Sequence, residues 1–286
     1  ASHASIKYCK HVGNVSCTFG SSPQNGEYYN GEQTNYVGGI VGNASYTDIM
    51  YCENKSDQIS NEASGTKNSS ARFYMRLGGI AGRAYRGSII SCMSISDYYA
   101  MFKGSMTMYM AIGGIVGFAY ITHYSWESST SSVNIYNCYS PSTWIYAGAG
   151  SSSTTVYYGS IVGQNSENGT VSTANANFGA SDLSINQTTL HKTKGYSGTT
   201  SFSSADMKTD AFLEELNVYP LLETGKTIWK RDTDYPYIAE LYETTSITPI
   251  IPDSKNRKES IYSITGVRLT APQKGINVIN GKKVLF

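Results

Sequence analysis

Gly38-Gly39-Ile40-Val41-Gly42 is the first of four copies of a glycine-framed pentapeptide. The other copies are Gly78-Gly79-Ile80-Ala81-Gly82, Gly113-Gly114-Ile115-Val116-Gly117 and Gly159-Ser160-Ile161-Val162-Gly163. The starts of successive copies lie 40, 35 and 46 residues apart. Repetition with a period of this size is typical of one structural unit stacked on copies of itself.

Each pentapeptide is followed by the same kind of neighbours. An isoleucine comes after it, and a cysteine lies three residues beyond that isoleucine. The pairs are Ile49 and Cys52, Ile89 and Cys92, and Ile135 and Cys138, and the chain opens on a further pair, Ile6 and Cys9. The third pair follows an insertion, 122–132, and the fourth copy degenerates to Val171 and Ala174. Such insertions are expected in the loops of a stacked unit.

The residues before each glycine pair alternate in character. Positions one, three and five before the pair are Val37, Asn35 and Gln33; Leu77, Met75 and Phe73; Ile112, Met110 and Met108; and Tyr158, Val156 and Thr154. The interleaved positions hold Tyr36, Tyr74, Arg76, Tyr109, Ala111 and Tyr157. Period-two alternation indicates a half-buried strand. We therefore predict three short strands per repeat: the alternating run, the glycine-framed run and the run that ends in cysteine.

Stacked repeats of short strands predict an all-β fold, a parallel β-solenoid of about four coils. One inward ladder would hold Ile40, Ile80, Ile115 and Ile161, and another would hold Cys9, Cys52, Cys92 and Cys138. The glycines would lie at bends, where a positive φ or a close backbone approach excludes a side chain. A β-sandwich of repeated hairpins and a β-propeller are the alternatives, and the variable repeat length disfavours the propeller.

The pentapeptide together with Ile135-Tyr136-Asn137-Cys138-Tyr139-Ser140 resembles the GLUG repeats of bacterial surface proteins. Such repeats also occur beside immunoglobulin-A-cleaving metalloproteases and in large adhesins. Phe212–Asn217, Trp229 and Tyr235-Pro236 resemble the helix, tryptophan and strand that close these arrays. The resemblance covers residues 1–243. It implies an adhesion-like protein exposed on the surface of a bacterium, and it carries over no catalytic residue.

The composition fits an extracellular protein. Charged residues make up 15% of the 286 residues, the formal net charge is +1, and tyrosine occurs 24 times. A nucleic-acid-binding protein would concentrate basic residues on one face, so we expect no nucleic-acid partner. No apolar run approaches the roughly 20 residues of a membrane span. We expect a secreted or outer-membrane, surface-exposed protein, and we interpret the start inside a repeat, without a signal peptide or initiating Met, as a processed or trimmed fragment.

The cysteines and histidines give no metal-binding pattern. The chain has five cysteines without a Cys-x-x-Cys pair, and His3, His11, His123 and His191 are scattered. We expect no zinc site, no other metal and no cofactor. Buried cysteines acting as small hydrophobic residues explain the ladder. A disulfide between Cys9 and Cys17 is the alternative.

Four segments follow from these patterns. Residues 1–200 form the repeat solenoid, and residues 201–243 form a cap with a helix at Ala205–Asn217 and a strand near Tyr235–Ile238. The helix would begin at Ser203 or Ser204 as N-cap and bury Met207, Phe212, Leu213 and Leu216. Residues 244–258 form a linker with two prolines, and 259–286 form a small tail of β-hairpins. The tail resembles the C-terminal tails of exported Bacteroidetes proteins.

Aromatic residues are the candidate binding residues. Tyr74 and Tyr109 occupy one outward position in consecutive repeats, and Tyr36 and Tyr157 share another. Such a row could bind sugar rings or a protein partner, or it could simply stabilise the sheet by cross-strand stacking. Loop aromatics add a second candidate group: Tyr124 and Trp126 in the insertion, and Trp144 after Cys138.

We therefore predict a module that binds an extracellular glycan or a host or bacterial surface protein. A polysaccharide lyase or glycoside hydrolase on a β-helix is one alternative, and a non-binding stalk is the other. No catalytic motif is present and no column of acidic residues forms in the repeats, so we expect no enzyme. Asp232 and Asp234, beside the cap, are interpreted as solvated side chains.

Overall fold

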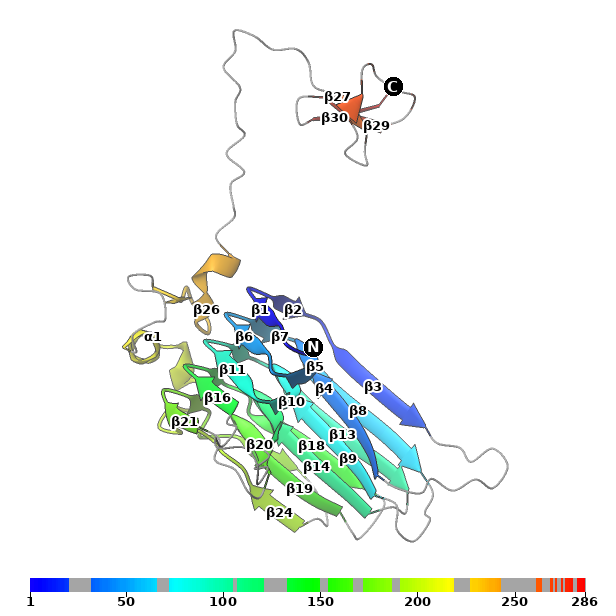
Figure 1. Cartoon of the computed structure of the whole chain (residues 1–286). Helices are drawn as coiled ribbons and strands as arrows, with labels where there is room; N and C mark the ends of the chain where they lie inside the picture. The colour runs from blue at the N-terminus through cyan, green and yellow to red at the C-terminus, as the bar shows by residue number, and fades with distance from the viewer. Residues whose placement is uncertain are drawn as a thin grey trace, which may run out of the picture. The chain divides into compact units, whose positions relative to one another are not determined.

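The computed structural model divides into two compact units, Ala1–Glu243 and Thr244–Phe286 (Figure 1). In the first unit the structure describes residues 1–20, 32–65, 72–104, 107–120, 133–149, 154–166, 172–186, 191–218 and 227–242. In the second it describes 261–263, 268–269, 271, 274, 276–279 and 282–285. Each unit is considered by itself below.

The first unit is a stack of coils, and a complete coil contains five short strands rather than the three that we predicted. The first coil holds β1 (Ser5–Lys7), β2 (Lys10–Val12), β3 (Val15–Gly20), β4 (Glu32–Gly38) and β5 (Val41–Ser45). The second holds β6 (Asp48–Met50), β7 (Glu53–Lys55), β8 (Gln58–Gly65), β9 (Arg72–Gly78) and β10 (Ala81–Tyr85). The third holds β11 (Gly87–Ile90), β12 (Met93–Ser94), β13 (Asp97–Gly104), β14 (Thr107–Gly113) and β15 (Val116–Tyr120).

The fourth coil repeats this order, and the fifth lacks the last strand within the described chain. The fourth holds β16 (Val133–Tyr136), β17 (Tyr139–Ser140), β18 (Trp144–Ala149), β19 (Thr154–Gly159) and β20 (Val162–Asn165). The fifth holds β21 (Ser172–Asn175), β22 (Phe178–Gly179), β23 (Ser184–Asn186) and β24 (His191–Lys194). The chain therefore winds through four complete coils and part of a fifth.

Equivalent strands of successive coils pair in parallel and build five sheets, numbered here by their first strand. Sheet 1 is β1-β6-β11-β16-β21, sheet 2 is β2-β7-β12-β17-β22, sheet 3 is β3-β8-β13-β18-β23, sheet 4 is β4-β9-β14-β19-β24, and sheet 5 is β5-β10-β15-β20. The registers keep equivalent repeat positions side by side, as in Ile49 beside Ile89 and Met75 beside Met110. This confirms the all-β parallel β-solenoid and excludes the repeated hairpins of a sandwich and the blades of a propeller.

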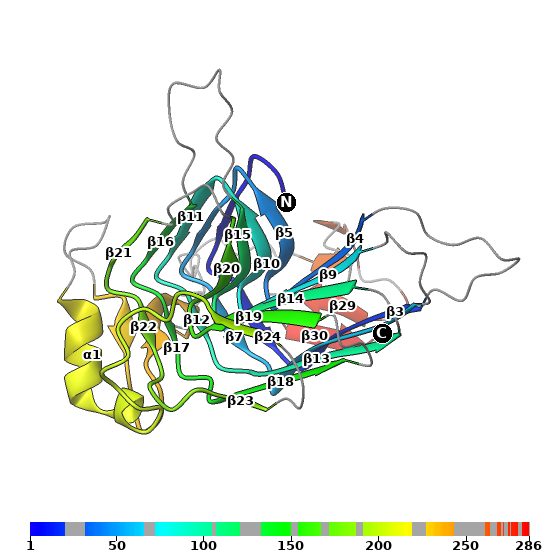
Figure 2. The same cartoon turned by 90° about the horizontal axis from the view of Figure 1, so that it is seen from below.

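Two apolar cores run along the stack. One lies between sheets 3 and 4 and includes Phe73, Met110 and Ile145. The other lies between sheets 5 and 1 and includes Ile89 and Val116. Seen along the stack, sheets 3 and 4 form a wedge, and sheets 5 and 1 form a second lobe that joins it at the glycine bends (Figure 2).

Both predicted ladders are present in the second core. Ile80 N donates to Ile115 O at 2.9 Å, and Ile115 N donates to Ile161 O at 3.0 Å. Cys52, Cys92 and Cys138 are fully buried, and all five cysteines carry free thiols. Cys9 packs against the core of sheets 5 and 1, whereas Cys17 packs against the core of sheets 3 and 4, so the alternative disulfide does not form.

The pentapeptide glycines allow the backbones of neighbouring coils to approach closely, and they do not adopt a left-handed conformation. None of them has a positive φ in the described chain. A Cβ on Gly79 would lie 2.1 Å from the carbonyl oxygen of Gly114 and 2.2 Å from Ser94 Oγ. Left-handed backbone occurs outside the pentapeptides, at eight described residues with side chains and at Gly13, Gly87 and Gly198. One such position recurs between sheets 1 and 2, at Tyr8, Tyr51, Ser91, Asn137 and Ala176.

A buried polar row separates the two apolar cores. Asn54 Nδ2 donates to Ser94 Oγ at 3.0 Å and to Ser96 Oγ at 2.8 Å. Tyr98 OH donates to the carbonyl oxygen of Gly114 at 3.0 Å. These contacts hold sheet 2 against the glycine bends and satisfy polar groups that burial would otherwise leave without a partner.

Tyr98 predicts a loss of stability at alkaline pH. Burial raises the pKa of its phenol to about 12, whereas an unfolded tyrosine ionises near pH 10. The stabilisation is therefore complete below about pH 10 and falls as the pH rises toward 12, by about 2–3 kcal/mol in total. Urea unfolding at several pH values should show a steeper alkaline decline for the wild type than for Tyr98→Phe. Parallel declines would contradict the assignment.

A small α+β element follows the coils. Helix α1 (Asp210–Asn217) is preceded by a 3-10 turn, Asp206–Lys208, and it begins later than predicted because Thr209 is its N-cap. The hydroxyl of Ser203 bonds to Asp206 in the turn instead. The strands β25 (Trp229–Lys230) and β26 (Tyr237–Ile238) pair antiparallel. The sequence predicted the helix and the strand near Tyr235–Ile238, and the structure adds β25 as the partner of that strand.

This α+β element covers the side of the stack and not its open end, where we had placed it. Its apolar face packs on the outer face of sheet 2, where the Phe212 ring lies 5.4 Å from the rings of Tyr139 and Phe178. The edge of the last coils is met by the preceding segment, in which Tyr196 exchanges backbone hydrogen bonds with Val162. The lateral position arises because sheet 2 carries the large apolar residues Met93, Tyr139 and Phe178 outward, and Tyr51 at the corner before β7 packs with them.

A buried carboxylate fastens the hairpin to the second coil. Glu53 is fully buried and accepts hydrogen bonds from the backbone N–H of Ile238 and, at 2.7 Å, from Tyr242 OH. Lys55 Nζ lies 3.6 Å from the same carboxylate, and Lys10 Nζ lies 3.8 Å from the centre of the Tyr242 ring. The α+β element therefore reaches from the fifth coil back to the first.

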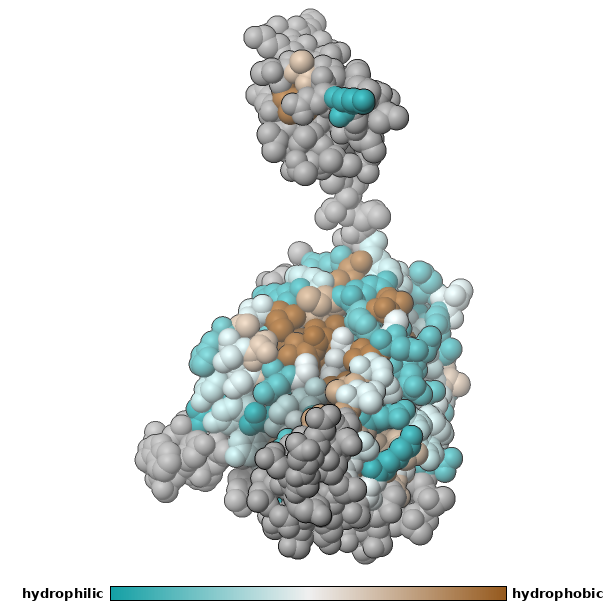
Figure 3. Space-filling model, turned by 90° about the vertical axis from the view of Figure 1, so that its right-hand side faces the viewer, coloured by the Kyte–Doolittle hydropathy of each residue, from teal (hydrophilic) through white to brown (hydrophobic). Residues whose placement is uncertain are grey.

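The first coil is the less buried end of the stack. Among the described strands, β1 to β5 are each the terminal strand of their sheet. Val37 and Ala44 are buried, but the other inward apolar side chains of this coil are only partly buried: Ile6, Cys9, Val15, Cys17, Phe19, Ile40 and Val41. Figure 3, which views the side of the molecule carrying this coil, shows an apolar band. The first coil thus has less of its apolar surface removed from water than the inner coils have.

The second unit is an antiparallel sheet with the order β28-β27-β29-β30. Its strands are β27 (Ile261–Ser263), β28 (Arg268–Leu269), β29 (Ile276–Ile279) and β30 (Lys282–Leu285). This agrees with the predicted hairpins of residues 259–286. Within the described residues, no helix is long and apolar enough to cross a membrane.

Candidate functional site

Sheets 4 and 5 meet at the glycine bends, and outward-facing residues of the two sheets touch across the angle between them. Arg76 on β9 contacts Phe118 on β15 and donates to Gln164 on β20. Arg83 on β10 faces Tyr36 on β4. We call this surface the aromatic–arginine strip. It consists of Tyr36, Tyr74, Arg76, Tyr109 and Tyr157 on sheet 4 and Arg83, Tyr85, Phe118 and Tyr120 on sheet 5.

Tyr74 and Tyr109 lie side by side, as their repeat positions predicted. They are register partners on β9 and β14, with ring centroids 5.1 Å apart and planes inclined by 16°. Tyr74 OH also donates to Glu32 at 3.1 Å, and Glu32 lies 3.8 Å from Arg72. Both rings are half-buried, so one face or edge of the pair remains open to solvent.

Tyr36 and Tyr157 share one position in the register but are not neighbours. Tyr36 pairs with Arg76, Arg76 with Ala111, and Ala111 with Tyr157. Two coils therefore lie between the two tyrosine rings, and an arginine and an alanine occupy the space. The sequence predicted the shared position correctly, but this pair makes no continuous aromatic surface.

Arg76 is a buried cation in the centre of the strip. It is 5% exposed, and its guanidinium carbon lies 4.1 Å from the Phe118 ring centre and 5.0 Å from that of Tyr74. Burial lowers the pKa of its guanidinium to about 10, although the nearby Tyr36, Tyr74 and Tyr157 oppose that shift. The two aromatic faces and Gln164 replace part of its lost hydration. Arg76 thereby connects sheet 4 to sheet 5.

Arg83 gives the strip a more accessible cation. Its guanidinium carbon lies 4.7 Å from the Tyr120 ring, 5.5 Å from Tyr85 and 5.6 Å from Tyr36. Its Nη1 donates to Asn43 Oδ1 at 3.4 Å. Arg83 is only half-buried, so its guanidinium can donate further hydrogen bonds to a ligand.

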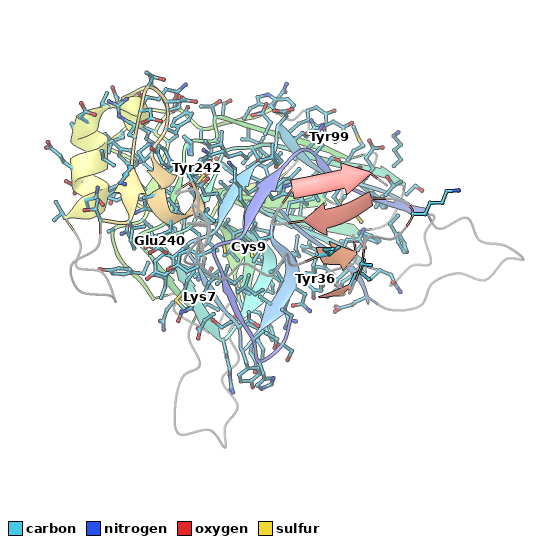
Figure 4. All side chains as sticks on the ribbon, turned by 90° about the horizontal axis from the view of Figure 1, so that it is seen from above. Lys7, Cys9, Tyr36, Tyr99, Glu240 and Tyr242 are labelled. Atoms are coloured by element: carbon cyan, nitrogen blue, oxygen red, sulfur yellow. The ribbon has the colours of Figure 1, made fainter. Side chains whose placement is uncertain are left out.

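The other predicted aromatics lie elsewhere. Trp144 is the first residue of β18 on sheet 3 and not a loop residue; its ring lies 5.9 Å from that of Tyr146. Tyr146 stacks on Tyr99 at 4.9 Å. Figure 4 shows Tyr36 and Tyr99 on opposite outer faces of the wedge of sheets 3 and 4. Tyr124 and Trp126 lie outside the described residues.

Sequence reasoning missed the contribution of sheet 5. Arg83 and Phe118 occupy the position directly after the pentapeptide, together with Asn43 and Gln164. That shared position was a signal in the sequence. The angle that brings these residues against Tyr36 and Arg76 was not, because it depends on how the two sheets meet.

The described residues contain no cluster of histidine, cysteine, aspartate or glutamate side chains that could hold a metal ion. Comparison of the chain with protein-family models, with curated proteins and with solved structures finds no match.

Proposed function

We propose that this protein is a carbohydrate-binding module of a secreted or surface-exposed protein and that the aromatic–arginine strip binds an extended glycan. The supporting observation is the stacked pair of Tyr74 and Tyr109 beside Arg76, whose guanidinium carbon lies 5.0 Å from the centre of the Tyr74 ring, on the surface where two sheets meet. Aromatic ring faces pack against the C–H faces of sugar rings, and the tyrosine hydroxyl groups form hydrogen bonds with sugar hydroxyls. The repeat places such side chains on successive coils, which suits a polymer.

The charges of the strip favour an acidic glycan. Arg76 and Arg83 lie within it, and Arg72 lies at its edge beside Glu32. A guanidinium binds the carboxylate of a uronic acid or a sulfate group through paired N–H donors. The proposed ligand is therefore an extracellular polysaccharide that carries such groups.

Replacing Tyr109 by alanine is expected to weaken glycan binding about tenfold, because the mutation removes a partly desolvated aromatic contact. Tyr74→Ala should act in the same way. The measurement is a glycan array that contains neutral, uronic acid and sulfated polysaccharides, followed by calorimetric titration of the strongest binder.

Tyr99→Ala is the matched control. It removes the same kind of stacked pair from the outer face of sheet 3, so its loss of stability should be similar and its glycan affinity unchanged. If no glycan binds, or if Tyr74→Ala and Tyr109→Ala bind like the wild type, the rings only stabilise the sheet and the stalk interpretation holds. Release of reducing or unsaturated sugars would instead favour the polysaccharide-degrading alternative.

A further inference from the structure

The aromatic–arginine strip continues along β10 to the corner that leads into sheet 1. The ring centroid of Tyr85, at the end of β10, lies 5.5 Å from that of Tyr120 within the strip. On its other side it lies 5.3 Å from the ring centroid of Tyr46, outside the strip. Tyr46 and Arg86 are the corner residues that follow β5 and β10. A row of contacts therefore leads from the angle between sheets 4 and 5 to this corner.

The corner is built from the side chains that precede three successive coils. His3, Tyr46 and Arg86 share a left-handed backbone, with φ of 51°, 50° and 52°. The rings of His3 and Tyr46 stack with centroids 4.6 Å apart and planes inclined by 7°, and Arg86 Nη1 donates to Tyr46 OH at 2.8 Å. The guanidinium of Arg86 is thus held in place by the protein itself, which lowers the entropy cost of binding a ligand there.

Arg83 and Arg86 approach the same aromatic ring. The guanidinium carbon of Arg83 lies 5.5 Å from the centre of the Tyr85 ring, and that of Arg86 lies 5.3 Å from it. The separation of the two guanidinium carbons therefore cannot exceed the sum of these distances. Three residues of extended chain also span about 10 Å. Two cations thus lie in line along the direction of β10, with a tyrosine between them.

Arg83 is the strip cation that is most open to a ligand. Within the described residues it makes no ion pair, and its hydrogen bond to Asn43 Oδ1 is long, at 3.4 Å. Arg72 is instead paired with Glu32, and Arg76 is only 5% exposed. A guanidinium has five N–H donors, so Arg83 retains donors for an acidic group.

We infer that Arg83 and Arg86 bind two separate carboxylates of one polyuronate chain, which lies along β10 and passes the edge of the Tyr85 ring. This inference rests on the proposed function of the strip and adds a second subsite, a direction for the glycan and a ligand class. Cations in line along one strand fit a ligand whose charges recur regularly. Carboxylates on one side of an extended polyuronate recur once per disaccharide, a comparable length, and a guanidinium pairs with each through two parallel N–H···O bonds.

The test uses the hexamers of galacturonic acid and of mannuronic acid, each beside its methyl ester. The ester keeps the sugar rings and removes the charge. At about pH 7 the carboxylates are ionised. Calorimetric titration of the whole chain should show at least one hexauronate binding at least about tenfold more tightly than its ester, with an affinity that falls as salt is added. Equal binding of acid and ester, or no binding of either acid, would overturn the inference.

Arginine variants test whether two carboxylates are bound. Arg83→Gln and Arg86→Gln should each weaken binding of the hexauronate about tenfold, and the double variant about a hundredfold, because independent contacts add in free energy. Lys103→Gln, which removes a cation from the outer face of sheet 3, is the control and should bind like the wild type. Unchanged binding by the single variants, or a double variant no weaker than a single one, would contradict two separate carboxylate sites.

The proposed function can survive the failure of this inference. If Tyr109→Ala weakens binding of an array glycan that both arginine variants bind like the wild type, the strip binds glycans and the arginine subsites are refuted. If sulfated glycans bind and neither hexauronate does, the strip again stands and the polyuronate assignment fails. If no glycan binds at all, the proposed function fails as well.

Discussion

Replacing Gly79 by alanine is expected to lower the free energy of unfolding of the repeat unit by about 3 kcal/mol. The new Cβ would lie 2.1 Å from the Gly114 carbonyl oxygen, a backbone atom of the next coil that cannot move without separating the two coils. Urea unfolding followed by far-ultraviolet circular dichroism measures the loss. Because coils stack directly on one another, the damage should spread to neighbouring coils.

Gly148→Ala is the control for this substitution. Its Cβ would come close to atoms at the ends of two side chains, Met101 and Tyr146, and flexible side-chain ends can shift. We expect a loss below about 1 kcal/mol for it. Equal losses in the two variants would show that the pentapeptide glycines are not required for close packing between coils.

The last pentapeptide already contains a natural exception that supports this reasoning. Ser160 replaces the second glycine and is 2% exposed. Directly against its Cβ lies Gly179, at the register position that holds Ser140 in the coil before. In the earlier copies the glycine belongs to the pentapeptide and the side chain belongs to sheet 2, as in Gly79 against Ser94. Each contact therefore has room for one side chain, and either strand can supply it.

Replacing Phe212 by alanine is expected to release the α+β element from the coils, at a cost of about 3–5 kcal/mol. Phe212 is fully buried, and its ring contacts Tyr139, Phe178 and Phe202 in T-shaped arrangements. The main-chain hydrogen bonds between coils do not depend on it. Residues 203–218 and 227–242 should thus lose protection while the inner coils keep theirs.

Amide hydrogen exchange by mass spectrometry separates the two regions. Exchange should accelerate in Asp210–Asn217 and remain slow in the strands of the third coil. Glu214→Ala, on the exposed side of the same helix, is the control and should leave exchange in both regions nearly unchanged. Simultaneous loss of protection in coils and helix would mean that the α+β element is needed for the solenoid itself to fold.

The sequence predicted those parts of the fold that repeat next to the glycine pentapeptides. The sequence alone was enough to predict the glycine bends, the isoleucine and cysteine ladders and the strands before the glycines. The strands of sheet 3, such as β8 and β13, were missed although Tyr98, Ala100 and Phe102 alternate inward, because no glycine motif marks them. The strands of sheet 2 contain two or three residues, which is too short for a period to be read.

For the candidate site, the sequence predicted which residues are neighbours within one sheet, but not which residues of different sheets are in contact. Register alone placed Tyr74 beside Tyr109, because equivalent positions stack on successive coils. The contact of Arg76 with Phe118 depends on the angle between two sheets, which no periodicity encodes. Likewise, the sequence predicted the apolar face of α1 but not the surface that this face covers. An apolar helix face can cover the open end of the stack or the outward row of Met93, Tyr139 and Phe178 equally well.

The α+β element has a consequence for how the protein can vary in length. Its helix rests on Phe178 in the fifth coil, while Tyr242 reaches Glu53 in the second and Lys10 in the first. Inserting or deleting one whole turn between these anchors would shift them by about one strand spacing, nearly 5 Å, and disconnect one end. The element therefore acts as a ruler that fixes the number of turns it spans, even though the turns themselves are interchangeable modules.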